Sequence, residues 1–128
     1  MALLWILLFS SFASWAPINR LAEKEVRYVI IEAECKSGFN ALPEYSEKVL
    51  LTNVFKREYE NAVEMVKAES ALISEFEVAL QASYPNQGNQ VGEIMVYMLT
   101  TEKEAKDLHK RKTKLFKTLN KGVVELKL

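Results

Sequence analysis

The sequence predicts an α+β domain of the ferredoxin-like type, with an antiparallel four-stranded sheet, two helices on one face, and the order βαββαβ. Two observations lead to this prediction. The segments follow one another as strand, helix, strand, strand, helix and strand. In addition, the first and third strands contain continuous apolar runs, YVII and IMVYML, as central strands do, whereas the second and fourth alternate as edge strands do.

The first strand and the first helix are predicted from residue type and spacing. Residues 25–35, EVRYVIIEAEC, are rich in Val, Ile and Tyr and are followed by a turn sequence, Lys36-Ser37-Gly38. The next segment begins at Pro43 and has large apolar residues mostly three or four positions apart: Tyr45, Val49, Phe55, Tyr59, Val63 and Val66. This spacing predicts a long amphipathic helix over 43–67.

The second and third strands are predicted on either side of a loop. Residues 70–82, SALISEFEVALQA, alternate between apolar and polar, which favours a half-buried strand, although their Ala, Leu and Glu content also suits a helix. The segment SYPNQGNQ then has the composition of a loop. Residues 93–100 follow as the third strand.

The second helix is predicted from its two ends. Thr101 and Glu104 form a capping box at its start, and Gly122 suits a left-handed stop after its end. The apolar residues expected to face the core are Ala105, Leu108, Leu115, Phe116 and Leu119. The last seven residues, GVVELKL, complete the pattern as the fourth strand.

The N-terminus has the features of a secretory signal peptide. Residues 1–16, MALLWILLFSSFASWA, carry no charge and pass from an apolar run to small residues, with small-x-small patterns that end at Ala13 and at Ala16. A retained anchor and a buried N-terminal helix are the alternatives, but a span needs about 20 apolar residues and this run is shorter. We expect a signal peptide over 1–16, a leader over 17–24 and one domain over 25–128. The expected location is secreted, with no membrane span after signal removal.

Charge and cysteine content narrow the classes of partner. The chain has 17 basic and 17 acidic side chains, so it has no net field to attract nucleic acid, and we expect no nucleic-acid partner. The single cysteine, Cys35, excludes an internal disulfide. In a secreted chain it is either available for an intermolecular disulfide or a small buried side chain.

Several of these features are shared with one extracellular family. Residues 42–63, LPEYSEKVLLTNVFKREYENAV, are similar to a pattern of a serine, an aromatic-rich helix and a basic-Phe step, and a final helix ending at Gly122 before a short apolar strand also fits. Over residues 25–128 the chain resembles the SEA domain of mucins and other cell-surface proteins. The resemblance implies a non-catalytic extracellular module that acts in protein–protein or matrix interaction.

Many SEA domains cleave their own backbone at a Gly-Ser-Val-Val-Val turn, where the serine hydroxyl attacks the preceding glycine carbonyl. The resemblance aligns that turn with Gly92, Glu93, Ile94, Met95 and Val96. Glu93 stands where the serine would be, and a carboxylate cannot make the N-to-O acyl shift. We therefore expect a degenerate cleavage turn and an uncleaved chain.

The open face of the predicted sheet is the expected contact surface. We assign Tyr28, Ile30, Met95, Tyr97 and Leu99 to it, and we expect self-association or docking to another protein there. No phosphate-binding loop, metal-ligand spacing or serine elbow is visible, so we expect no enzyme activity, no cofactor and no metal. The alternatives are a ferredoxin-like RNA- or peptide-binding domain with no true signal peptide, and a subunit of a ferredoxin-like lyase or isomerase.

Overall fold

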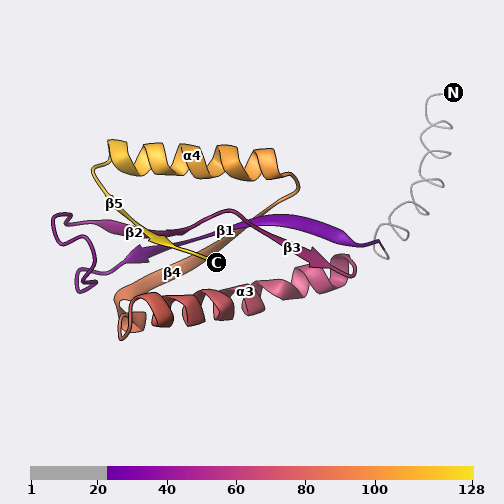
Figure 1. The fold of residues 1–128 in the computed structure, drawn as a ribbon, viewed down its shortest axis with the longest axis horizontal. Helices are drawn as coiled ribbons and strands as arrows, with labels where there is room; N and C mark the ends of the chain where they lie inside the picture. Colours follow the sequence, from indigo (N-terminus) through magenta and orange to yellow (C-terminus); the bar gives the residue numbers. More distant parts are fainter. Residues whose placement is uncertain (1–22) are drawn as a thin grey trace, which may run out of the picture.

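The computed structural model describes residues 23–128 (Figure 1). The elements in chain order are β1 (Glu25–Cys35), β2 (Lys48–Thr52), β3 (Phe55–Tyr59), α3 (Ala62–Ser83), a 3-10 turn η1 (Gly88–Gln90), β4 (Val91–Leu99), α4 (Glu102–Thr118) and β5 (Gly122–Leu126). This part of the chain is α+β, with two helices and a curled, mixed sheet of five strands. The predicted signal peptide, and the leader up to residue 22, lie outside the described residues.

The sheet is built around the long strand β1. One edge of β1 pairs with β2 at residues 32–34 and with β3 at residues 25–29, while β4 pairs antiparallel along residues 28–35. Because the β4 register overlaps both of the others, β4 must occupy the opposite edge of β1. The fifth strand pairs in parallel with β2. The prediction of a purely antiparallel four-stranded sheet is therefore wrong.

The predicted helix over 43–67 is wrong over most of its length, because two short strands, β2 and β3, lie there; only its last residues, 62–67, are helical, at the start of α3. All five residues of β2, KVLLT, are buried, so this strand has no polar face and no visible period of two. Only β3, FKREY, shows the alternation of a half-buried strand. The three- and four-residue steps that favoured a helix run across several elements, with Val49 in β2, Phe55 in β3 and Val63 in α3.

The predicted strand over 70–82 lies within α3. The Asn61 side chain accepts a hydrogen bond of 2.9 Å from the Glu64 amide and caps the helix at its start. The buried residues of α3 are spaced by four: Ala68, Leu72, Phe76 and Leu80. A spacing of four is a multiple of two and is also close to one helical turn, so it fits both structures. Val78, which the strand would have buried with them, is 72% exposed.

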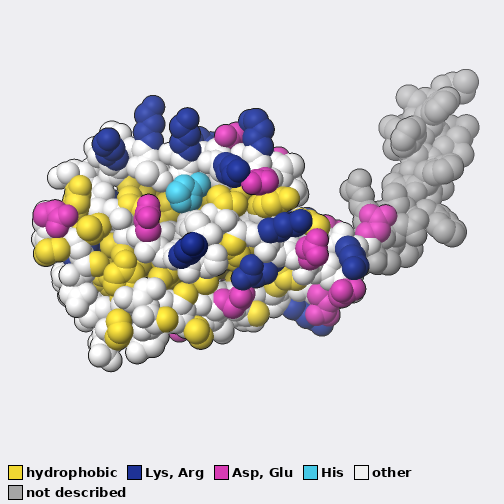
Figure 2. Space-filling model, in the orientation of Figure 1, with side chains coloured by type: hydrophobic (Ala, Val, Ile, Leu, Met, Phe, Trp, Pro, Cys, Tyr) yellow, Lys and Arg dark blue, Asp and Glu magenta, His cyan; other side chains and the backbone are white. Residues whose placement is uncertain are grey.

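The other four elements are confirmed, with one change at the end of α4. The Thr101 hydroxyl caps this helix by accepting a hydrogen bond of 3.1 Å from the Glu104 amide. Basic side chains gather over α4 (Figure 2). The left-handed residue after the helix is Asn120, with φ of 56°, and not Gly122. Gly122 is instead the place where Tyr45 packs against the backbone, because an added Cβ would lie 2.8 Å from its ring.

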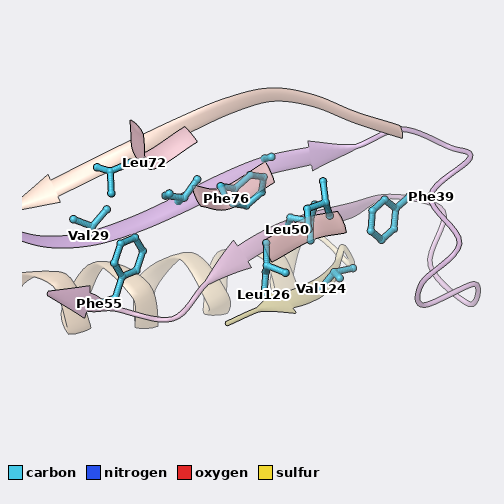
Figure 3. Close-up of a cluster of buried hydrophobic side chains, with 11 residues drawn as sticks. Val29, Phe39, Leu50, Phe55, Leu72, Phe76, Val124 and Leu126 are labelled. Carbon is cyan, nitrogen blue, oxygen red and sulfur yellow. The ribbon is translucent and has the colours of Figure 1, made fainter. Parts of the chain in front are cut away.

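The two helices cover opposite faces of the sheet (Figure 1). Under α3, the main cluster of buried side chains brings together β1, β2, β5 and the helix, with members such as Val29, Leu50, Phe76 and Leu126 (Figure 3). Under α4, a smaller cluster contains Ile30, Val49, Leu51, Ala105 and Phe116. The prediction that both helices lie on one face and leave the other open is therefore wrong.

The path of the chain explains this arrangement. Strands β3, β4 and β5 all run in the same direction, so β3-α3-β4 and β4-α4-β5 are both crossover connections between parallel strands. The first crossover passes β1 in one direction and the second passes back. Crossovers of the usual right-handed kind that run in opposite directions place their helices on opposite faces.

Candidate interaction surface

The residues predicted as an open contact face lie under α4. The structure does bring them together, since Tyr28 is opposite Leu99 and Ile30 is opposite Tyr97 on adjacent strands. However, Ile30 is completely buried, and Tyr28, Tyr97 and Leu99 are half-buried against the cluster beneath the helix. Met95, at 38% exposure, is the one exposed member of the predicted set.

An exposed apolar strip nevertheless remains where α4 and β4 meet. Leu108 packs against the same cluster as Tyr97 and Leu99, and it lines a shallow hollow together with Leu99. Leu115 is two turns further along the same side of the helix, and Leu119 continues this line past its last turn. Leu115 and Leu119 are 52% and 53% exposed. We call this surface the α4–β4 strip, and it consists of Met95, Tyr97, Leu99, Leu108, Leu115 and Leu119.

The exposure of Leu115 and Leu119 corrects the prediction that both face the core. Leu115 and Phe116 are consecutive residues, so they point about 100° apart on the helix, at 3.6 residues per turn. Phe116 is buried at the centre of the contact, which leaves Leu115 at its margin. The predicted apolar residues spread over a wide part of the helix surface, and this width indicated that some of them would lie outside the core.

A buried ion pair fixes α4 above this part of the sheet. Lys112 Nζ lies 2.7 Å from Glu32 Oε1 on β1, although the direction is poor for a hydrogen bond. The same Nζ donates a hydrogen bond of 3.1 Å to the Tyr97 hydroxyl and lies 4.3 Å from the centre of its ring. Burial by itself lowers the pKa of Lys112, but the contacts with Glu32 and Tyr97 outweigh it and raise this pKa above its ordinary value.

The outer edge of β4 has no strand partner among residues 23–128. Its nine residues, VGEIMVYML, contain one charged side chain, Glu93, and no Pro or Lys. The other two strands with a free edge differ from it, since β3 carries Lys56, Arg57 and Glu58, and β5 is only five residues long with a charge at Glu125. Charged residues and short length are the usual ways in which edge strands avoid pairing. The β4 edge is long and has only the single charge of Glu93.

The degenerate cleavage turn is not a turn in the structure. Gly92, Glu93, Ile94, Met95 and Val96 all lie inside β4, after the 3-10 turn η1. No glycine among the described residues has a positive φ. The backbone at the Gly92–Glu93 bond is therefore ordinary extended strand, and the expectation of an uncleaved chain stays a prediction.

Cys35 is half-buried at the end of β1. Burial raises the pKa of its thiol to about 11, against the smaller opposing effects of the Lys48 charge and a backbone hydrogen bond. The Lys48 ammonium is itself held by the backbone carbonyls of Phe39 and Ala41. A thiol with this pKa is almost entirely protonated at neutral pH, which disfavours nucleophilic chemistry. The expectation of an intermolecular disulfide stays untested.

The described residues contain neither a metal-binding cluster nor a membrane-spanning helix. Between residues 23 and 128, no group of three or more His, Cys, Asp or Glu side chains is placed to hold a metal ion. Neither α3 nor α4 is long and apolar enough to cross a membrane.

Comparison with known proteins adds no relative. A scan of protein-family models finds no match to the chain, and searches of curated proteins and of solved structures find no significant match. The resemblance to SEA domains therefore stays a prediction. It has also lost most of the helix over 43–67, which was part of the pattern, because β2 and β3 occupy residues 48–52 and 55–59.

Proposed function

We propose that this chain is a secreted, non-catalytic module that acts by binding protein through the α4–β4 strip. The observation that carries the proposal is the exposure of three large apolar side chains, Met95, Leu115 and Leu119, beside a strand edge with almost no charge. Apolar surface that is contiguous, and not scattered, usually marks a site of association. The apolar N-terminal 16 residues support the secreted location.

The geometry of the strip suits a protein better than a small molecule. The hollow beside Leu99 and Leu108 is shallow, and its rim carries charges of both signs, from Glu104, Asp107, Lys110 and Arg111. Small-molecule sites enclose most of their ligand, whereas protein interfaces combine a modest apolar centre with a polar rim. The α4–β4 strip has the second arrangement.

The experiment tests secretion and binding together. The tagged full chain is expressed in secreting cells, and proteins bound in the medium are captured by chemical cross-linking. A Leu115→Asp/Leu119→Asp variant should lose the captured partner. The matched control, Val66→Asp/Val78→Asp, changes two residues of α3 that are 73% and 72% exposed, and it should retain that partner. Equal capture by both variants would refute the strip as the binding surface.

Intact mass of the secreted protein tests the remaining parts of the proposal. The recovered chain should begin at Ser14 or Pro17, and it should stay in one piece at the Gly92–Glu93 bond. Recovery of the chain in the cytosol with Met1 in place would refute secretion. Fragments divided at residues 92 and 93, formed without added protease, would show that the chain cleaves itself.

A further inference from the structure

We propose that β4 pairs antiparallel with β4 of a second copy of this chain, so that the two sheets become one continuous sheet across a twofold axis. The inference rests on the proposed function, because it names the partner of the α4–β4 strip. It also depends on a feature that the strip alone does not supply, which is the unpaired backbone edge of β4.

The chemistry of the β4 edge favours a strand as its partner. Along this edge, backbone N–H and C=O groups have no partner strand among residues 23–128, and extended backbone is what satisfies such a row. Both side-chain rows of β4 are largely apolar, with Ile94, Val96 and Met98 toward α3, and Met95, Tyr97 and Leu99 toward α4. The partner strand must therefore be apolar on both faces as well, and β4 itself meets that requirement.

Charge favours a second copy and fixes the register. Antiparallel pairing with complete overlap of residues 91–99 places Met95 opposite the partner's Met95. It also places Glu93 opposite the partner's Tyr97 on the α4 side. The Lys112 ammonium lies over that tyrosine ring in each copy, so Glu93 of one chain meets the positive charge of the other. Glu93 takes part in none of the ion pairs found among the described residues.

The same register avoids the repulsion that other pairings create. Glu93 is the one charged residue of β4, so a shift that placed it opposite its own copy would bring two carboxylates together, and like charges on directly opposite residues are destabilising. In the complete overlap the two Glu93 side chains are separated along the strands. The two α4 helices then lie on the same side of the joined sheet, and Leu115 of each helix faces the twofold axis.

Cysteine cross-linking tests the register directly. Residues directly opposite in an antiparallel pair have Cα atoms about 4.5–5.5 Å apart, which is within the range that a disulfide spans. In a Cys35→Ala background, Met95→Cys should therefore form a disulfide-linked dimer under mild oxidation of the purified, secreted protein. Glu93→Cys and the α3 surface variant Val66→Cys should not, because neither residue meets its own copy in this register. Equal cross-linking of all three variants would show random collision and would overturn the proposal.

Sedimentation velocity tests the pairing without oxidation. The wild-type protein should sediment as a dimer at micromolar concentration. Met95→Lys places two ammonium groups opposite each other at the axis, so we expect its dissociation constant to rise by about 100-fold. Val66→Lys should leave that constant unchanged, and circular dichroism should show both variants folded. A wild-type protein that stays monomeric, or that forms open-ended aggregates, would overturn the proposal.

The two tests separate this inference from the proposed function. If the purified protein is monomeric and Met95→Cys does not cross-link, self-pairing is wrong. The proposed function still stands in that case if Leu115→Asp/Leu119→Asp loses a different protein in the medium. If the strip variant loses nothing and the purified protein still forms the cross-linked dimer, self-pairing stands and binding of another protein fails.

Discussion

Removing the positive charge of Lys112 should destabilise the fold by about 3 kcal/mol, because breaking one side of a buried ion pair costs about 3–5 kcal/mol. Its Nζ lies 2.7 Å from Glu32 Oε1, and the two side chains are 16% and 8% exposed. Lys112→Met keeps most of the aliphatic stem but leaves the Glu32 carboxylate buried without a cation. The remaining exposure of Lys112 places this pair at the lower end of the range.

The contribution of Lys112 to stability should depend on pH. At the alkaline end, the raised pKa of Lys112 means that its contribution is complete below about pH 10.4 and is lost as the pH rises through the folded pKa.

Urea unfolding followed by circular dichroism at pH 7 measures the effect. The matched control is Lys103→Met, whose pair with Asp107 has a comparable 2.9 Å separation but side chains that are 85% and 56% exposed. That change should leave the free energy of unfolding nearly unchanged, because an exposed ion pair contributes little to stability. Adding Glu32→Leu to Lys112→Met should restore the free energy of unfolding to within about 1 kcal/mol of wild type. If Lys112→Met were as mild as the control, α4 would not cover Glu32 in solution.

Two further predictions test α3 and Cys35. Phe76→Ala removes a completely buried ring and should cost about 3–5 kcal/mol, whereas Val78→Ala should change the free energy of unfolding by less than about 0.5 kcal/mol; equal losses would refute the register of the helix. Alkylation of Cys35 by iodoacetamide should be about 100-fold slower at pH 8 in the native protein than in urea, and its rate should keep rising until about pH 11. A native rate that levels off near pH 9 would contradict the burial of the thiol.

The elements that the sequence predicted correctly have strong local signals. The first strand and β4 contain uninterrupted apolar runs, and α4 begins at a capping box that the structure retains at Thr101. The elements that the sequence predicted wrongly have ambiguous local signals. Strand β2 is buried on both faces and shows no period, and the fourfold spacing of Leu72, Phe76 and Leu80 on α3 fits a strand as well as a helix. Periodicity cannot separate such cases without knowledge of which neighbours cover the segment.

The candidate surface was predicted in part for the same reason. The pairing of Tyr28 and Ile30 with β4 follows from a central apolar strand, and the structure places them together. Their exposure depends on where α4 lies, and that depends on the order of strands across the sheet. Once the first predicted helix was misplaced along the chain, the number and direction of the crossovers changed. Leu115 and Leu119 were predicted in the core from the apolar pattern of the helix alone, and the structure leaves them outside it.

The crossovers also explain why the outer edge of β4 is left uncovered by the rest of the described fold. The strands before and after β4 in the chain, β3 and β5, lie on the far side of β1. The connections through α3 and α4 therefore run over the interior of the sheet. Neither connection passes over the outer edge of β4. A short or charged strand there would be protected by its own sequence, as β3 is by Lys56 and Arg57. Because β4 is instead nine residues long and nearly uncharged, its edge can be satisfied only from outside the described fold.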